Sequence, residues 1–235
     1  RVISRSGGKV VWEALSRAGG YQLACRASLE CDGYMNYELT LTPSAAGELK
    51  DIRLEIPLRS DAARYMMGMG RKGGKRPPNW KWTWDVSRSN CHVWIGDVNA
   101  GLHLKLKHVT PRWDLFNLKE SGLYRDWGND GKGGCTIDED GGRVVLRAFT
   151  GPRKAAATQA LHFNFGLLVT PIKTLDKAHW DWRYFHRSHA APLGEIVPTG
   201  AKVVNLHQGD AYNPHINYPF LSDDKLKPYI DAAHA

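Results

Sequence analysis

The chain has 235 residues, of which 42% are apolar and 24% are charged, and its formal net charge is +8. This composition is ordinary for a globular protein and excludes disorder of the chain as a whole. The sequence contains no run of about twenty apolar residues and no signal-peptide pattern, so we predict neither a membrane span nor a membrane partner. We expect the chain to be a piece of a longer protein.

Apolar residues alternate with polar ones in several long segments, which is the period of a half-buried β-strand. These segments cover residues 21–41, with a break at Asp32-Gly33, and residues 52–58, 102–106 and 161–169. The turn Asp140-Gly141-Gly142 predicts a hairpin between strands at 135–138 and 143–149. Helical periodicity is almost absent before residue 170, so we predict a mainly β fold in which residues 1–170 form an antiparallel β-sandwich.

Basic residues concentrate in residues 70–78, which contain Arg71, Lys72, Lys75 and Arg76. Elsewhere the basic residues are scattered among acidic ones. We interpret this segment as a solvated loop, and the alternative is an anion-binding loop. The sequence contains no motif of a DNA- or RNA-binding module, so we predict no nucleic-acid partner.

Three tryptophans alternate along the chain at Trp80, Trp82 and Trp84. Placement at every second residue directs all three indole rings to one side of a strand. A buried sandwich face requires this placement, so we favour a role in the core. The alternative is a row of exposed rings that stacks on the apolar faces of sugars. Burial of the rings would exclude this alternative.

Residues 89–102 interrupt the strand alternation with Gly96, Asp97, Asn99 and Gly101. Isolated glycines within a strand indicate a bulge or the close approach of another group to the backbone, and we favour the bulge. The side chains of Asp97 and Asn99 could present oxygen atoms to a sugar hydroxyl or a cation. Two oxygen ligands are too few for a calcium site.

The four cysteines lack the spacing of a zinc site, and we predict no metal and no cofactor. Cys25 and Cys31 share one predicted strand face and lie about 20 Å apart in an extended strand, which is too far for a disulfide. We therefore predict that they are buried thiols. Whether Cys91 and Cys135 form a disulfide stays open, because the sequence does not give their distance in space.

The tightest acidic cluster consists of Asp138, Glu139 and Asp140. An adjacent Asp-Glu pair serves substrate-assisted glycosidases, in which one carboxylate orients an acetamido group and the other protonates the leaving oxygen. Here the pair adjoins a hairpin turn, where we expect it to be solvated and to lack the burial that raises the pKa of a catalytic acid. We therefore assign the cluster to the hairpin and predict no catalytic residue in this chain.

The last third of the chain predicts a different architecture. Residues 171–200 are rich in proline and aromatic residues and read as a linker, whereas residues 201–207 read as a strand that leads into a polar loop at 208–220 and a helix up to Ala235. We predict that residues 201–235 are the first βα unit of an incomplete (β/α)8 barrel. In such barrels the loops that follow the strands carry the chemistry.

His207, Gln208 and Asn213 lie at or just after the carboxyl end of this predicted strand. They are therefore candidates for hydrogen bonds to a ligand in the barrel mouth. The alternative is that they cap the next helix and anchor the loop to the sandwich. Ser222, followed by Asp223 and Asp224 in the first turn, already provides a helix cap, and the sequence does not separate the two roles.

Four segments together resemble a known family. They are Val93–Leu102 (VWIGDVNAGL), Phe165–Pro171 (FGLLVTP), Trp180–Tyr184 (WDWRY) and Asn205–Phe220 (NLHQGDAYNPHINYPF). They resemble the N-terminal region of bacterial proteins related to glycoside hydrolase family 123, which carry a β-sandwich ahead of a (β/α)8 catalytic barrel. The resemblance implies a periplasmic or extracellular enzyme. Characterised members remove N-acetylgalactosamine with an Asp-Glu pair on a barrel strand, and we expect that pair downstream of Ala235.

Our main hypothesis is that the chain is the non-catalytic sandwich and the barrel start of a glycoside hydrolase that acts on a complex glycan. The sandwich would support the downstream barrel by intramolecular contact and line the substrate cleft. The predicted substrate contacts are Trp94, Asp97, His207, Gln208 and Asn213. The alternative is a freestanding carbohydrate-binding or adhesion module that uses the surface tryptophans Trp80, Trp82 and Trp84.

Overall fold

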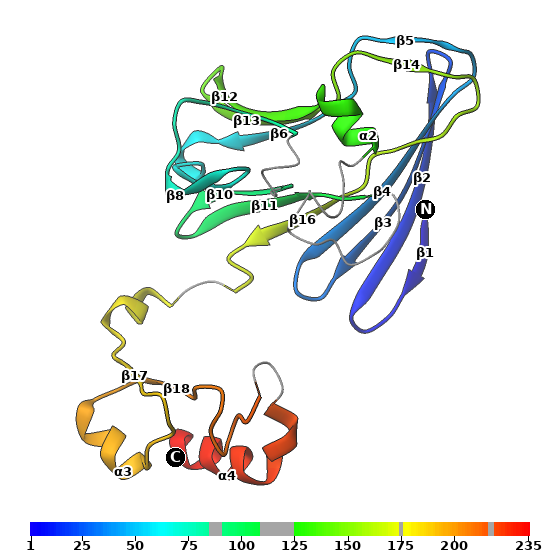
Figure 1. Cartoon of the computed structure of the whole chain (residues 1–235). Coiled ribbons are helices and arrows are strands. Elements are labelled where there is room, and N and C mark those ends of the chain that lie inside the picture. Colours follow the sequence, from blue (N-terminus) through cyan, green and yellow to red (C-terminus); the bar gives the residue numbers. More distant parts are fainter. Residues whose placement is uncertain (85–90, 109–124, 174–175, 216–218) are drawn as a thin grey trace. The chain divides into compact units, whose positions relative to one another are not determined.

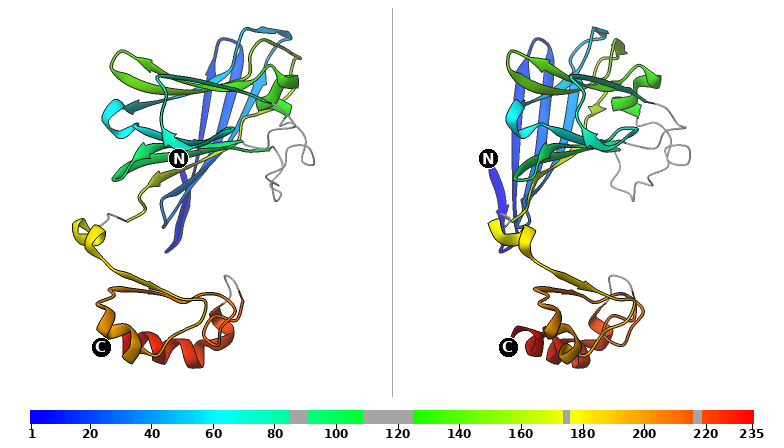
Figure 2. Two further views of the ribbon diagram at one scale, coloured as in Figure 1. Left: turned by 60° about the vertical axis from the view of Figure 1, so that its left-hand side comes forward. Right: turned by 90° about the vertical axis from the view of Figure 1, so that its left-hand side faces the viewer.

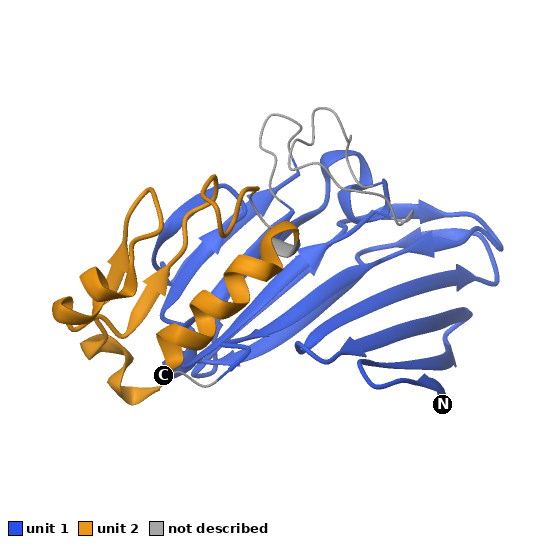
Figure 3. Ribbon diagram, turned by 90° about the horizontal axis from the view of Figure 1, so that it is seen from below, with its two compact units in different colours: residues 1–174 blue, residues 175–235 orange. Residues whose placement is uncertain are grey.

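The computed structural model of the chain describes residues 1–84, 91–108, 125–173, 176–215 and 219–235. Parts of the predicted segments 89–102 and 208–220 lie outside these described residues. The chain divides into two compact units, residues 1–174 and residues 175–235, which Figure 3 colours separately.

The first unit is built on a ten-stranded sheet in which every pair of neighbouring strands is antiparallel. The long alternating segment at 21–41 forms two of these strands, joined at Asp32-Gly33 as predicted. The spatial order is β1 (Val2–Arg5), β2 (Lys9–Ala18), β3 (Tyr21–Glu30), β4 (Tyr34–Pro43), β16 (Phe165–Thr170), β11 (Ala100–Leu106), β10 (His92–Asp97), β7 (Tyr65–Gly68) and β8 (Arg71–Lys75), and β15 (Leu161–His162) also pairs with β4.

A second, four-stranded sheet packs against part of the first, and Figures 1 and 2 show the two layers from three sides. Its order is β6 (Arg53–Arg59), β13 (Arg143–Phe149), β12 (Gly134–Asp140) and β9 (Asn79–Thr83). The short strands β5 (Gly47–Leu49) and β14 (Arg153–Ala155) pair with each other. The unit also contains the helix α2 (Arg125–Gly128) and two 3-10 turns, η1 (Ser60–Ala62) and η2 (Asn129–Gly131). The predicted antiparallel sandwich is confirmed.

The β12–β13 hairpin has the turn that the sequence predicts. Gly141 and Gly142 have φ angles of +57° and +80°, a conformation that glycine adopts without steric cost. The acidic cluster lies beside this turn and is ion-paired: the Arg147 guanidinium lies 2.8 Å from Asp140 and 3.4 Å from Asp138. The cluster therefore belongs to the hairpin and is not a buried acid pair.

The basic segment 70–78 is not a loop. Its first half is the edge strand β8, which pairs with β7. The Arg76 side chain is only 7% exposed and forms an ion pair of 2.8 Å with Glu139, and the Arg71 guanidinium lies 5.6 Å from the ring centroid of Trp80. Since two of its four cations are engaged within the fold, the solvated-loop interpretation holds only for the exposed Lys72 and Lys75.

The tryptophan row lines the core. Trp82 and Trp84 are 4% and 5% exposed, and Trp80 is half-buried against the same cluster. Trp82 lies opposite Cys135 and Trp80 opposite Ile137 on β12, both of which are buried. The core interpretation is therefore confirmed, and a stacking platform built from these rings is wrong.

The core covers only part of the large sheet. Its main cluster draws side chains from β4 but none from β1, β2 or β3, which extend beyond the second sheet (Figure 1), although Ala27 on β3 is buried. Leu23 and Leu29 on β3 are consequently 37% and 40% exposed, although they continue the apolar alternation. The buried-thiol prediction is wrong for the same reason, since Cys25 is half-buried and Cys31 is exposed. Cys91 and Cys135 are buried, and neither forms a disulfide.

The second unit contains two parallel strands, β17 (Tyr184–His186) and β18 (Val203–Asn205). The short helix α3 (Leu193–Ile196) and the 3-10 turn η4 (Val197–Thr199) lie between them in the chain, η3 (Lys177–Asp181) precedes them, and η5 (Pro219–Ser222) and α4 (Asp223–His234) follow. The strand predicted at 201–207 is therefore shorter, and the predicted linker contains its parallel neighbour. Parallel strands joined through a helix are the repeating unit of a (β/α)8 barrel.

The start of α4 differs from the prediction in one respect. Ser222 is its N-cap residue and is buried, but its side chain makes no capping hydrogen bond. Asp223 and Asp224 occupy the first turn, where carboxylates interact favourably with the helix dipole. Among the helices that the structure describes, none combines the length and apolar character needed to cross a membrane.

Candidate functional site

The carboxyl ends of β17 and β18 bring two histidines together. His186 is the last residue of β17, His207 lies two residues beyond β18, and their ring centroids are 5.5 Å apart. The Nδ1 atom of His207 lies 2.7 Å from the backbone oxygen of Gln208, so Nδ1 donates this hydrogen bond. In the tautomer that carries its proton on Nδ1, the Nε2 atom has a lone pair that can accept a hydrogen bond from a hydroxyl group.

The loop after β18 is organised by Asp210, which the sequence analysis did not single out. Its carboxylate accepts hydrogen bonds from the backbone N–H groups of Tyr212 at 2.8 Å and Asn213 at 2.9 Å. It also accepts one from Ala190 at 3.1 Å, which lies in the segment between β17 and α3. Asp210 therefore ties the two loops that follow the parallel strands to each other.

Asn213 combines an anchored backbone with an unsatisfied side chain. Its backbone oxygen accepts a hydrogen bond of 2.7 Å from Gly209. Its Oδ1 atom is buried and has no hydrogen-bond partner among the described residues. A buried acceptor without a donor costs free energy, so this atom would gain from a donor supplied by a ligand or water.

The three predicted barrel residues all lie in the segment that follows β18. His207 and Asn213 lie in one loop that the structure holds by internal hydrogen bonds, whereas the Gln208 side chain is exposed. The rings of Tyr212 and Tyr229, whose centroids are 4.7 Å apart, anchor this loop to α4. His186 was missed as a site residue because it lies in the predicted linker, and the only signal was the short apolar pair Tyr184-Phe185 before it.

Trp94 and Asp97 lie on the β10–β11 hairpin of the first unit. The two strands pair in continuous register, with Gly96 opposite Gly101, so the predicted bulge is wrong. The close-approach alternative is correct, because a Cβ atom on Gly96 would lie 2.4 Å from Cζ2 of Trp94. The indole N–H of Trp94 donates to the Thr170 hydroxyl at 2.8 Å.

Asp97 already has partners within the hairpin. Its Oδ2 atom lies 3.2 Å from Nε of Arg64, and its Oδ1 atom accepts a hydrogen bond of 2.7 Å from the backbone N–H of Val98. The carboxylate thus fixes the turn between β10 and β11. It retains lone pairs for a further donor, since an ionised carboxylate accepts about four hydrogen bonds.

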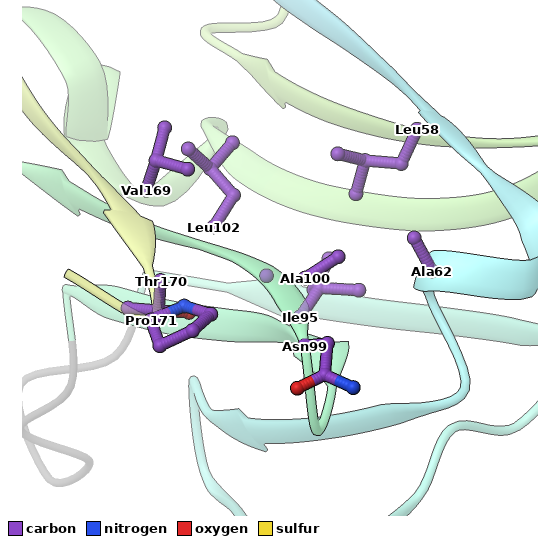
Figure 4. A pocket seen from close by; sticks show the side chains of 10 residues that line it. Leu58, Ala62, Ile95, Asn99, Ala100, Leu102, Val169, Thr170 and Pro171 are labelled. Carbon is purple, nitrogen blue, oxygen red and sulfur yellow. The ribbon is translucent and has the colours of Figure 1, made fainter. Parts of the chain in front are cut away.

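A pocket of about 400 Å³ opens between the two sheets next to this turn (Figure 4). Its wall is apolar, with Leu58 from β6 facing Ile95, Leu102 and Val169 from the large sheet. Of the described residues that line it, only Asn99 and Thr170 have polar side chains. Since neither can donate or remove a proton at neutral pH, the pocket can hold an apolar group but offers no acid–base chemistry.

A histidine pair occupies the outer face of the same strands. Nδ1 of His92 lies 3.0 Å from Nε2 of His103, and their rings meet edge to face. Burial lowers the pKa of both imidazoles. Charge repulsion lowers both pKa values further: Lys105 acts on His92, and His92 and Lys105 act on His103. Both rings are therefore neutral near pH 7, with one ring donating to the other.

This pair predicts a loss of stability in acid. The ordinary pKa is 6.5, and because the folded value is lower, the unfolded chain binds more protons as the pH falls below 6.5. Stability is thus expected to be full above pH 6.5 and to fall below it. Urea unfolding at pH 7.5 and pH 5.5 measures this loss, which should be smaller in His103→Gln than in the exposed control His189→Gln. Equal losses would contradict the assignment.

Metal binding has no support in the described part of the chain. No group of three His, Cys, Asp or Glu side chains there is placed to hold a metal ion.

Comparison with known proteins identifies the family of both units. Residues 1–171 match the model of the third domain of glycoside hydrolase 123, and residues 176–235 match the model of its TIM-barrel domain. No curated protein matches the chain.

Two solved structures are distantly similar to the chain. A proposed aldose 1-epimerase from Escherichia coli K12 is 11% identical, with a TM-score of 0.40 over 74% of this chain and 68% of that one. A galactose mutarotase related enzyme from Lactobacillus acidophilus is 5% identical, with a TM-score of 0.37 over 73% of this chain and 71% of that one. Similarity at this level says nothing about function. The two family models, in contrast, account for nearly every residue, and the chain therefore belongs to glycoside hydrolase family 123.

Proposed function

We propose that this chain supplies the non-catalytic β-sandwich and the first strands of the catalytic barrel in a glycoside hydrolase that acts on a complex glycan. The observation that carries the proposal is the meeting of His186 and His207 at the carboxyl ends of two parallel strands. In (β/α)8 enzymes, substrate binds at this end of the strands. Membership of the glycoside hydrolase family supports a carbohydrate as that substrate.

In this proposal His207 and Asn213 bind sugar hydroxyls and leave the acid–base chemistry to carboxylates elsewhere in the enzyme. The Nε2 atom of His207 accepts a hydrogen bond from one sugar hydroxyl, and the buried Oδ1 atom of Asn213 accepts a hydrogen bond from another. Gln208, which follows His207 in the chain, is exposed and is a further candidate for a hydrogen bond to the sugar. Asp210 acts as a positioning residue, because it holds the loop and uses its carboxylate for backbone groups.

The sandwich acts in support of the barrel. The pocket beside the β10–β11 turn is lined by no titratable side chain among the described residues, and the acidic cluster is ion-paired on a hairpin, both of which favour a non-catalytic role. Trp94 and Asp97 remain predicted contacts of a glycan. We also propose that the enzyme works in the periplasm or outside the cell, which fractionation of the producing cells would test.

The barrel-end proposal predicts a loss of activity on substitution in the full-length enzyme. His207→Ala and Asn213→Ala are each expected to lower kcat/KM for a chromogenic N-acetylgalactosaminide about tenfold, because each removes one hydrogen bond to the sugar. His215→Ala is the matched control, since His215 lies exposed in the same loop. Unchanged kcat/KM in both test variants, with folding verified by circular dichroism, would refute the proposal.

A further inference from the structure

The outer face of the large sheet carries a row of side chains that crosses five strands in register. Trp94 pairs with Met67 on one side and with His103 on the other, His103 pairs with Leu168, and Leu168 pairs with Tyr34. We call these five residues the outer row. With neighbouring strands about 4.8 Å apart, the row is roughly 19 Å long. The residues that alternate with it, such as Val93, Ile95 and Leu104, point into the core and are buried, so the outer row faces away from the core.

Glycines make room for the two aromatic rings of this row. A Cβ atom on Gly101 would lie 2.8 Å from Nε1 and 2.9 Å from Cζ2 of Trp94, and one on Gly166 would lie 2.9 Å from Cζ of Tyr34. The edge of the Trp94 indole that carries the N–H group therefore lies against the sheet, where the N–H donates a hydrogen bond to the Thr170 hydroxyl. The remainder of this half-buried ring is apolar. Apolar ring surface beside hydrogen-bonding groups is what the C–H face of a sugar requires.

The charged side chains that the structure describes in the outer row and in the row beside it are basic. The next row of the sheet contains His92, Lys105, Gly166 and Asn36, and Lys107 follows at the end of β11. The Lys107 ammonium lies 5.0 Å from the ring centroid of Tyr34 and donates to Oδ1 of Asn36 at 2.6 Å, which leaves it further N–H donors.

The carboxylates described beside these rows have partners within the fold, and one of them, Asp32, accepts a hydrogen bond of 2.9 Å from the backbone N–H of Tyr34. Among the described side chains of these two rows there is no carboxylate. Glu38, farther along β4, accepts a hydrogen bond from the Asn36 amide at 3.2 Å, and Asp97 pairs with Arg64. The face therefore combines aromatic rings with basic side chains and favours an anionic partner.

We propose that the outer row binds an acidic glycan, with a sugar ring packed on Trp94 and a uronate or sulfate group bound by Lys107. The site lies on the sandwich and goes beyond the proposed barrel function. A nucleic acid also combines rings with negative charge. It needs a track of cations along its backbone, however, whereas the row offers few cations together with imidazole and amide groups suited to hydroxyls.

Affinity electrophoresis of the full-length protein tests the site, with chondroitin sulfate as the probe. Dextran is the neutral comparison and a single-stranded oligonucleotide is the nucleic-acid comparison. We expect chondroitin sulfate to retard the protein at low salt, Trp94→Ala to weaken this binding about tenfold, and Lys107→Gln to weaken it and flatten its salt dependence. Trp180→Ala and Lys72→Gln, at exposed positions outside the outer row, are the matched controls and should bind as the natural protein does.

Several results would overturn the proposal. Absence of retardation at low salt, equal binding by Trp94→Ala and Trp180→Ala, or equal retardation by dextran would each do so. Tighter binding of the oligonucleotide would replace the glycan with a nucleic acid. If Trp94→Ala does not fold, Leu168→Glu on the same row tests the site instead, because its added charge should repel the anionic probe.

The outer row and the barrel end can fail separately. His207→Ala is expected to lower hydrolysis of the small chromogenic substrate while retaining full retardation by chondroitin sulfate. Loss of retardation in His207→Ala would place the acidic glycan at the barrel end and overturn the outer-row site.

Discussion

Trp82→Ala is expected to lower the free energy of unfolding of the sandwich by about 3–5 kcal/mol, the usual cost of removing a buried tryptophan side chain. The Trp82 ring is 4% exposed, meets Trp84 edge to face with centroids 4.9 Å apart, and lies in the interior between the two sheets. Its loss leaves a cavity that neighbouring strands can fill only by shifting. Denaturant unfolding monitored by far-ultraviolet circular dichroism measures the change.

Two variants separate packing from other effects. Trp82→Phe keeps an aromatic ring and removes an indole N–H that is buried without a partner in the described part of the chain, so we expect it to cost much less than the alanine variant. Trp180→Ala removes a ring that is 74% exposed and should leave stability nearly unchanged. A small effect of Trp82→Ala, similar to that of Trp180→Ala, would show that the tryptophan row is not a structural element and would reopen the stacking hypothesis.

The alternation of apolar and polar residues predicted the sandwich, because successive side chains of a strand point to opposite faces of the sheet. The same pattern did not predict how much of the large sheet is covered. Leu23 and Leu29 alternate as regularly as the core residues Leu104 and Leu106, yet they are exposed. An apolar face has the same sequence whether this chain or another partner covers it. Coverage depends on the extent of the second sheet, which is a long-range property.

The errors at the candidate sites have local causes. The turn at Val98-Asn99 lacks a glycine at its centre, so Gly96 and Gly101 appeared to be a bulge, although they make room for Trp94. Strand β17 is only three residues long, too short for alternation to stand out from a linker. The contact between the His186 and His207 rings depends on that strand. The sequence pattern therefore indicated only His207 as a site residue.

Asp126 illustrates a structural role that no local pattern indicates, because its partners lie far away in the chain. Its Oδ1 atom pairs with the Arg153 guanidinium at 3.2 Å, and its Oδ2 atom accepts a hydrogen bond of 2.8 Å from the backbone N–H of His162. The side chains of Asp126 and Arg153 are 3% and 11% exposed. This pair ties α2 to β14 and β15.

Asp126→Ala is expected to lower the free energy of unfolding by about 3–5 kcal/mol, because it leaves a buried guanidinium without its counter-charge and a buried N–H without its acceptor. Asp126→Asn should cost less, since the amide oxygen can still accept from His162. Denaturant unfolding compares both with Glu30→Ala, which breaks the exposed pair with Lys9 and should cost no more than about 1 kcal/mol.

The double variant Asp126→Leu/Arg153→Met distinguishes a stabilising ion pair from a buried charge that merely needs its partner. Removing both charges eliminates the desolvation cost of the pair, so we expect the double variant to be more stable than Asp126→Ala. Asp126 is then best understood as fixing the position of β14 against β15, and its charge adds little net stability. A double variant less stable than Asp126→Ala would mean instead that the ion pair itself stabilises this end of the sandwich.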